Sequence, residues 1–271
     1  MSIKAMPLWK WILLFLISLV LGFILLSIGQ ASNIPDVAVW LSCLINVALP
    51  AAMLVLYALF VKIIERTPAK DLPMRRLASE TGKGFGIGTL FFVVVVAVML
   101  ICGVYKFVSV NIGNIDLIIQ ALFFFITVAV GEEILFRGIM FRWIDEKWGF
   151  TAALVVSSLL FGFMHIFQPG ASWWSSIAIA IEAGLLLGAA YKYSGTLWLP
   201  IGIHWGWNFF QGNIFGIEVS GSDAGESLFI PEISGPEILT GGAFGAEASI
   251  IAFVLGLMLS IWFIIKVAKR R

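Results

Sequence analysis

Long runs of apolar residues, separated by short polar segments, dominate the chain. A helix crosses the hydrocarbon core of a bilayer with about 20 predominantly apolar residues. By that length the sequence predicts about eight transmembrane helices. Their approximate ranges are 8–28, 37–63, 85–105, 115–141, 150–167, 175–191, 197–214 and 247–267. We therefore expect an all-α, polytopic membrane bundle that forms a single domain over residues 1–271.

The positions of the basic residues orient this bundle. Of the 17 Lys and Arg residues, Arg137 lies within a predicted span and Lys106 lies in a segment on one side. When the eight spans alternate, the other fifteen, Lys4, Lys10 and Arg271 among them, fall on the opposite side. Cytoplasmic segments of membrane proteins are enriched in Lys and Arg. We therefore expect both termini to be cytoplasmic, with the first apolar run kept as a span.

Composition supports a membrane protein. Hydrophobic residues make up 61% of the chain and charged residues only 12%, against about 25% charged residues in soluble domains. A net charge of +1 argues against a nucleic acid partner. We therefore expect lipids as neighbours, and the lack of a long polar domain favours a prokaryotic cell membrane.

The last outer segment, residues 212–246, is acidic. It contains no Lys or Arg and five carboxylates, at Glu218, Asp223, Glu226, Glu232 and Glu237. A long segment between spans is usually a mobile, solvated loop, and we expect that here. A lid and a contact for a basic partner remain the alternatives.

Three charged residues lie at the end of the apolar run 115–130: Glu132, Glu133 and Arg137. Each ionisable side chain near the bilayer centre costs roughly 2.5–3.5 kcal/mol on insertion scales, so such groups are paired or functional. Glu133 and Arg137 are four residues apart on one helix face, with the acid first, which favours an ion pair. Glu132 lies about 100° around the helix and is free to face a cavity as a general base. The alternative is that all three charges only hold neighbouring helices together. A further membrane carboxylate, Glu182, is expected at a helix interface or in support of the site, and a direct role in the site is the alternative.

The chain has two histidines, His165 and His204, and both lie in predicted spans. Asn208 follows His204 by four residues, so the two side chains share a helix face. An imidazole N–H and a carboxamide N–H together supply two donors for a developing oxyanion. His165, from another helix, is suited to orient a water molecule that Glu132 deprotonates.

Other hydrolytic chemistries lack support. The sequence has neither a Gly-x-Ser-x-Gly nor a His-Glu-x-x-His motif, and Cys43 and Cys102 lie outside the polar motifs. We expect no cofactor. A zinc site formed by Glu132, His165 and His204 remains the alternative on composition.

These residues resemble the motifs of a known family. The motifs are Glu132-Glu133-x-x-x-Arg137, Phe161-x-x-x-His165 and His204-x-x-x-Asn208, together with the segment 195–204. They are similar to those of the CPBP family, the group of CAAX-processing endopeptidases and bacteriocin-processing proteins. The resemblance covers about residues 115–214, a core that follows N-terminal helices at 1–114 and precedes an outer loop and last helix at 215–271.

The resemblance implies an all-helical intramembrane endopeptidase. In this family Glu132 with His165 would activate the water, and His204 with Asn208 would stabilise the oxyanion. Glu133 and Arg137 would support them. The family has been described as metal-dependent, but a glutamate-activated water explains the same residues.

We therefore expect the protein to hydrolyse a peptide bond in a hydrophobic peptide or in the lipidated C-terminal tail of a protein. The alternative is a non-catalytic membrane scaffold or a bacteriocin self-immunity protein of the same family. A proton or ion path is disfavoured, because the stretch 117–130 offers only Gln120 and Thr127 as polar groups. The sequence leaves the oligomeric state undetermined.

Overall fold

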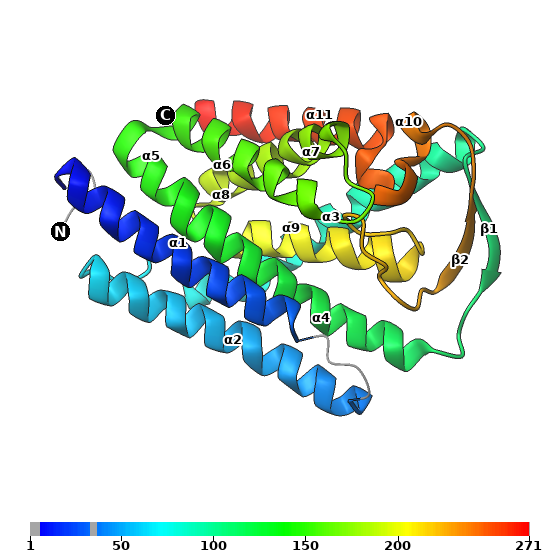
Figure 1. Ribbon diagram of the computed structural model, residues 1–271, viewed down its shortest axis with the longest axis horizontal. Helices are drawn as coiled ribbons and strands as arrows, with labels where there is room; N and C mark the ends of the chain where they lie inside the picture. Colours follow the sequence, from blue (N-terminus) through cyan, green and yellow to red (C-terminus); the bar gives the residue numbers. More distant parts are fainter. Residues whose placement is uncertain (1–5, 33–36, 271) are drawn as a thin grey trace.

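A computed structural model describes residues 6–32 and 37–270, so Lys4 and Arg271 of the predicted topology lie outside the described residues. The chain forms a bundle of helices that run along its long axis (Figure 1). The N-terminal elements are the helices α1 (Leu8–Gln30), α2 (Val39–Ile64) and α3 (Leu77–Ile101), with a short 3-10 turn η2 (Met74–Arg76) before α3.

The central part of the chain is a series of helices broken by short π-helical and 3-10 segments. It comprises α4 (Ile115–Glu133), the π-helix η3 (Ile134–Phe141), α5 (Arg142–Trp148), α6 (Phe150–Met164), the 3-10 turn η4 (His165–Phe167), α7 (Trp173–Ile179), the π-helix η5 (Ala180–Leu185), α8 (Leu186–Ser194), α9 (Trp198–Phe209) and the π-helix η6 (Phe210–Ile214).

The C-terminal part contains short elements followed by one long helix. These are β2 (Phe229–Ile233), α10 (Glu237–Thr240), the 3-10 turns η7 (Gly242–Phe244) and η8 (Ala246–Ala248), and α11 (Ile250–Ala268). Strand β2 pairs antiparallel with β1 (Tyr105–Val110), with Tyr105 opposite Ile233.

Seven helical segments of the described chain are long and apolar enough to span a membrane. They are Leu8–Gly29, Val39–Ile64, Met74–Ile101, Ile115–Trp148, Phe150–Phe167, Trp173–Ser194 and Ile250–Ala268. The remaining predicted span, 197–214, is also helical, as α9 and η6, but it is shorter and almost entirely buried. The predicted helical membrane bundle is therefore confirmed, and the protein is a multi-pass integral membrane protein.

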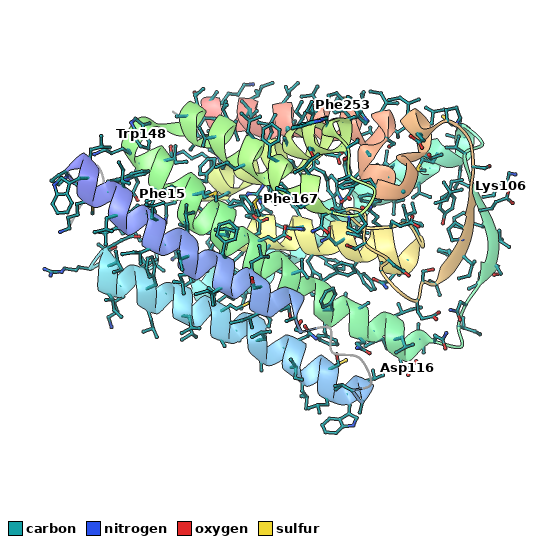
Figure 2. The ribbon with its side chains drawn as sticks, in the orientation of Figure 1. Phe15, Lys106, Asp116, Trp148, Phe167 and Phe253 are labelled. Carbon is teal, nitrogen blue, oxygen red and sulfur yellow. The ribbon has the colours of Figure 1, made fainter. Side chains whose placement is uncertain are left out.

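Both ends of the described chain lie at the same end of the bundle, on the left in Figure 1. The two-stranded sheet lies at the opposite end, which we call the outer end because the charge pattern predicts it to face away from the cytoplasm. The sheet was not predicted. The third span was expected to reach residue 105, but α3 ends at Ile101 and Tyr105 begins β1. In Figure 2, Lys106 and Asp116 lie at the outer end and Trp148 lies at the end that carries the termini.

The distribution of side chains is that of a protein surrounded by lipid. Large apolar side chains are exposed along the outer faces of α1 and α2, for example Leu16, Val20 and Leu44. Polar side chains are buried inside, among them Glu133 and Arg137. Because lipid solvates apolar groups and not polar ones, this pattern is stable in a bilayer and would not be in water.

Helix α9 lies in the centre of the bundle and packs closely against α3. Glycines on both helices make this approach possible: Gly84 and Gly88 on α3, Gly202 and Gly206 on α9. A Cβ added to Gly88 would lie 2.1 Å from the Ile203 carbonyl oxygen. Small residues at four-residue spacing allow two helix backbones to touch in this way. The contact fixes the helix that carries His204 and Asn208.

The α3–α9 contact gives a direct test. We expect Gly88→Ala to lower the free energy of unfolding by about 1–3 kcal/mol, because the new methyl group meets backbone atoms that cannot move independently. Thermal unfolding in detergent micelles measures the loss. Gly86→Ala is the matched control, since a Cβ there meets nothing within 4 Å, and it should leave the unfolding midpoint unchanged or slightly higher. Equal midpoints for the two variants would contradict this packing.

Candidate functional site

One cavity brings the polar motifs together. Its volume is about 740 Å³, and its deep part is lined by Glu132, His165, His204 and Asn208. These side chains come from three different parts of the bundle: α4, the turn after α6, and α9. The rest of the cavity is lined by Gln168, by the outer half of α4 and by the outer segment. It therefore opens toward the outer end of the bundle.

The two adjacent glutamates have different environments. Glu133 is fully buried, and its Oε1 accepts a hydrogen bond from Arg137 Nη1 at 2.7 Å, so the ion pair predicted from the four-residue spacing is present. The Glu132 side chain keeps 12% of its surface exposed and borders the cavity. The helix geometry predicted this division between the two carboxylates.

Further contacts hold Arg137 in place. Its Nη2 lies 3.3 Å from the Ala183 carbonyl oxygen and 3.4 Å from that of Gly184. Both carbonyls belong to the π-helix η5, whose i→i+5 hydrogen-bond pattern differs from that of the flanking α-helices. The guanidinium also lies 4.6 Å from the centre of the Phe161 ring. Arg137 thus joins three segments of the bundle around the pair.

His204 lies between the two glutamates. Its Nδ1 is 3.0 Å from Glu133 Oε1, the same oxygen that binds Arg137. Because an ionised carboxylate only accepts hydrogen bonds, the Nδ1 atom carries a proton. The Nε2 atom lies 3.7 Å from Glu132 Oε2, which is beyond hydrogen-bond range. Glu133 therefore fixes the orientation of the imidazole and directs Nε2 toward Glu132.

His165 is oriented by its own helix. Its Nδ1 lies 2.7 Å from the Phe161 carbonyl oxygen, one turn earlier. A carbonyl only accepts, so Nδ1 donates and the Nε2 atom of a neutral ring is left as an acceptor. The ring is half-buried and borders the cavity. The Phe161-x-x-x-His165 spacing thus sets the tautomer of His165, and the Phe161 ring also packs over Arg137.

Asn208 is 6% exposed and makes no side-chain hydrogen bond within the described part of the chain. Helix α9 holds it firmly. Trp205 Nε1 donates to the Leu122 carbonyl of α4 at 2.8 Å, and the Trp207 ring stacks on Phe91 of α3 at 4.2 Å. The backbone that carries Asn208 is therefore held in place, and its carboxamide borders the cavity as a donor and acceptor.

The outer segment forms a wall of this cavity. Nine of its residues border the cavity: Val219, Ser220, Ser222, Asp223, Ala224, Gly225, Glu226, Ser227 and Ile230. It contains β2 and short helices and is tied to α9 and η6, for example by Asn213 Nδ2, which donates to the carbonyls of Ala224 and Glu226 at 2.8 Å each. The expectation of a loop without secondary structure was therefore wrong, although several residues of the segment are exposed as expected. Asn213, at the start of the segment, binds its backbone, and β2 pairs with β1.

Glu247 is a carboxylate whose position the sequence analysis did not single out. It is 2% exposed, and its Oε1 accepts from Trp207 Nε1 at 3.0 Å. Its Oε2 accepts from the backbone N–H of Ser220 at 2.7 Å and from the Ser220 hydroxyl at 2.9 Å. Burial raises the pKa of Glu247, while a positive charge on His165, when that ring is protonated, and the hydrogen bonds from Ser220 and Trp207 oppose that rise. Glu247 links the cavity wall to α9. In sequence it stands at the boundary of a span, where a charged residue is ordinary.

Metal-ligand geometry is absent from the described residues. No group of three or more His, Cys, Asp or Glu side chains is arranged there to hold a metal ion. The Nδ1 atoms of His165 and His204 bind protein acceptors, which leaves the Nε2 atom of each ring to contact a ligand in the cavity. Glu132, His165 and His204 border one cavity.

Comparison with known proteins gives one match. Residues 114–210 match the family model described as Rce1-like, type II CAAX prenyl endopeptidase. No curated protein and no solved structure matches the chain. The matched segment contains Glu132, Glu133, Arg137, His165, His204 and Asn208. The resemblance inferred from the motifs is therefore confirmed, and at the level of the family the match supports a protease in the membrane.

The buried ion pair predicts a large stability effect. We expect Arg137→Met to lower the free energy of unfolding by about 3–5 kcal/mol, because Glu133 would keep a buried charge without its cation. Chemical or thermal unfolding in micelles measures it. Lys106→Met is the control, since it breaks an exposed pair with Glu232 whose side chains are more than half accessible, and it should change stability little. If both variants lowered the free energy of unfolding by similar amounts, the buried Arg137–Glu133 pair would not contribute more to stability than an exposed pair.

The Glu247 contacts predict a local effect. Glu247→Ala removes the acceptor for two donors of Ser220, so the segment 218–227 should open more readily. We expect amide hydrogen exchange at Ser220 to accelerate on the order of tenfold or more, while exchange in α3 stays unchanged. Glu237→Ala, an exposed residue of the same outer segment, should leave the exchange of Ser220 as it is. An unchanged rate in Glu247→Ala would show that other contacts hold the wall.

Proposed function

We propose that the protein hydrolyses a peptide bond with a water molecule activated by Glu132. The match of residues 114–210 to the Rce1-like model of type II CAAX prenyl endopeptidases supports this proposal. The observation that supports the proposal is that Glu132, His165, His204 and Asn208 all line one cavity, with His204 Nε2 3.7 Å from Glu132 Oε2. The substrate is a hydrophobic peptide or the lipidated C-terminal tail of a protein, and the reaction needs no metal.

The water molecule has two acceptors in this arrangement. A carboxylate oxygen of Glu132 accepts one of its hydrogens, and Nε2 of His165 accepts the other, because Nδ1 of His165 already donates to Phe161. A lone pair of the water oxygen is then directed at the scissile carbonyl carbon. Glu132 takes the proton as the C–O bond forms, which is general-base catalysis.

Two donors face the carbonyl oxygen as it becomes an oxyanion. One is the Asn208 carboxamide N–H, which has no protein partner in the described residues. The other is Nε2–H of His204. Glu133 occupies Nδ1 of that ring at 3.0 Å, so donation from Nε2 requires the ring to be protonated on both nitrogens. Carboxylates on both sides of the ring favour this cationic form. Fixed donors in a site of low dielectric stabilise the oxyanion strongly.

Glu132 also acts in the last step of the proposed reaction. The proton held by Glu132 passes to the nitrogen of the leaving amine as the C–N bond breaks, and the carboxylate is restored. Glu133 and Arg137 touch no substrate in this scheme. They hold His204 in position and balance the charge next to it.

Glu132→Gln should lower kcat by about 10²–10⁴-fold, because an amide cannot take the proton of the attacking water. Glu182→Gln is the matched control: Glu182 is another fully buried glutamate of the bundle, and it does not border the cavity. We expect its kcat to equal that of the wild type. The measurement is turnover of apolar peptides by the purified full chain, with thermal unfolding to verify that each variant folds.

Two results would contradict the proposal. Equal turnover in Glu132→Gln and the wild type would remove Glu132 as the base, and full biological activity of that variant would support a scaffold. Loss of turnover after strong chelation, restored by stoichiometric zinc, would replace the metal-free reaction by the zinc alternative.

A further inference from the structure

The cavity of the proposed active site carries negative charge along its outer wall. Asp223 and Glu226 border it there, and Glu132 borders it at its deep end. Its lining contains no Lys or Arg. A peptide that approaches the deep polar groups from the outer end therefore passes two carboxylates that have no basic residue beside them in the cavity.

The charges of these two carboxylates are not neutralised by the protein. Glu226 Oε2 accepts from the Asn111 carboxamide at 2.7 Å, and Asp223 Oδ1 accepts from the Gly225 backbone N–H at 2.8 Å. Both donors are neutral groups, so they orient the carboxylates and leave their negative charge in place. Because Asn213 fixes the intervening backbone, the carboxylates are held at the wall.

The surroundings add to this negative field. Exposed carboxylates of the same end include Asp116, Glu218, Glu232 and Glu237. Lys106 is the basic residue of the described outer end, and its Nζ lies 3.4 Å from Glu232. Figure 2 shows both Lys106 and Asp116 at the outer end. A negative cleft with apolar walls attracts positive ligands and raises their local concentration.

A second observation shows that the cavity is built for a ligand with polar groups. Asn208 is 94% buried and borders the cavity, and its side chain makes no hydrogen bond with the described residues, so its carboxamide is available to a polar group of a bound molecule. The part of the lining from the outer half of α4 is mostly apolar, with Leu117, Phe124 and Val128, and includes one polar side chain, Gln120. The cavity thus combines a mostly apolar wall, an acidic wall and an amide that is available to a ligand.

We propose that the substrate is a cationic amphipathic peptide: an apolar segment flanked by Lys or Arg that enters from the outer end of the bundle. This inference rests on the proposed peptidase function. The apolar segment lies along α4, a backbone carbonyl meets Asn208, and the basic flank lies against Asp223 and Glu226. Because these wall charges act on the bound peptide and not on the reacting bond, they lower KM and leave kcat largely unchanged.

The test uses three synthetic peptides with one shared apolar core and two lysines, two serines or two glutamates at each end. The full chain should cleave them in that order, with kcat/KM for the lysine peptide above that for the glutamate peptide on the order of tenfold. High ionic strength should reduce the difference, because salt screens charges at an exposed rim. The double variant Asp223→Asn/Glu226→Gln should cleave all three about equally.

Glu218→Gln/Glu237→Gln is the matched control, since it removes the same charge from exposed residues of the outer segment that do not border the cavity. It should keep the order of the wild type. Equal cleavage of the three peptides by the wild type would overturn the inference. If Asp223→Asn/Glu226→Gln still cleaves the three peptides in the order of the wild type, the inference is also overturned. If the control variant loses that order to the same extent, the effect comes from the general negative field of the outer end, and the inference is overturned as well.

Binding separates this inference from the proposed function. The same peptides, fluorescently labelled, are titrated against the Glu132→Gln chain, with and without Asp223→Asn/Glu226→Gln. If the lysine peptide binds most tightly but the wild type cleaves none of the peptides, the peptidase function is overturned and a cationic peptide is supported as the ligand. If the wild type cleaves all three peptides equally, the peptidase function is supported and the cationic substrate is overturned. If the wild type cleaves no peptide and binding does not depend on the peptide charge, both proposals are overturned.

Discussion

The buried pair between Glu133 and Arg137 is the constraint on which the site depends. A charge inside a membrane bundle is costly unless it is paired, and a single oxygen of Glu133 binds both Arg137 at 2.7 Å and His204 at 3.0 Å. The pair therefore joins α4 to α9. Through its contacts with the carbonyls of η5 and with the Phe161 ring, Arg137 also fixes the segments that precede and follow the turn at His165. The groups that border the cavity are positioned by one buried cation and its carboxylate.

Close helix packing supplies the second condition. The glycines that α3 and α9 present to each other bring the two backbones into contact, so α9 lies deep in the bundle with its indole groups tied to neighbouring elements. One segment of π-helix contains Arg137, a second follows Asn208 on α9, and a third, between α7 and α8, supplies the carbonyls that bind Arg137. Such segments are frequent at functional sites, because they shift side chains around the helix and free carbonyls for other partners. Local irregularity and close packing together bring polar groups to one cavity in an otherwise apolar bundle.

The outer segment changes the character of this cavity. Glu247 accepts hydrogen bonds from Ser220, and Asn213 donates to the backbone carbonyls of Ala224 and Glu226. Strand β2 pairs with β1. These contacts hold the glycine-rich segment as a wall of the cavity. Its carboxylates face the space that leads to Glu132. The end of the bundle opposite the termini is therefore a source of negative potential beside the cavity. In the reaction we propose, the chemistry at the deep end and the selection of the substrate at the outer wall are separate properties of one cavity.

The sequence by itself determined the membrane bundle, the pairing of Glu133 with Arg137 and the residue types of the site, because apolar run length and helical spacing are local properties of the chain. It also predicted that Glu132 faces a cavity, since the angle between adjacent helix positions is fixed. The ends of α3, the strand at Tyr105, the buried contacts of Glu247 and the wall formed by the outer segment were decided only by the tertiary structure. These features depend on partners far away in sequence: Ser220 and Trp207 for Glu247, and Ile233 for Tyr105. No local pattern encodes such partners, because they come together only when the whole bundle packs.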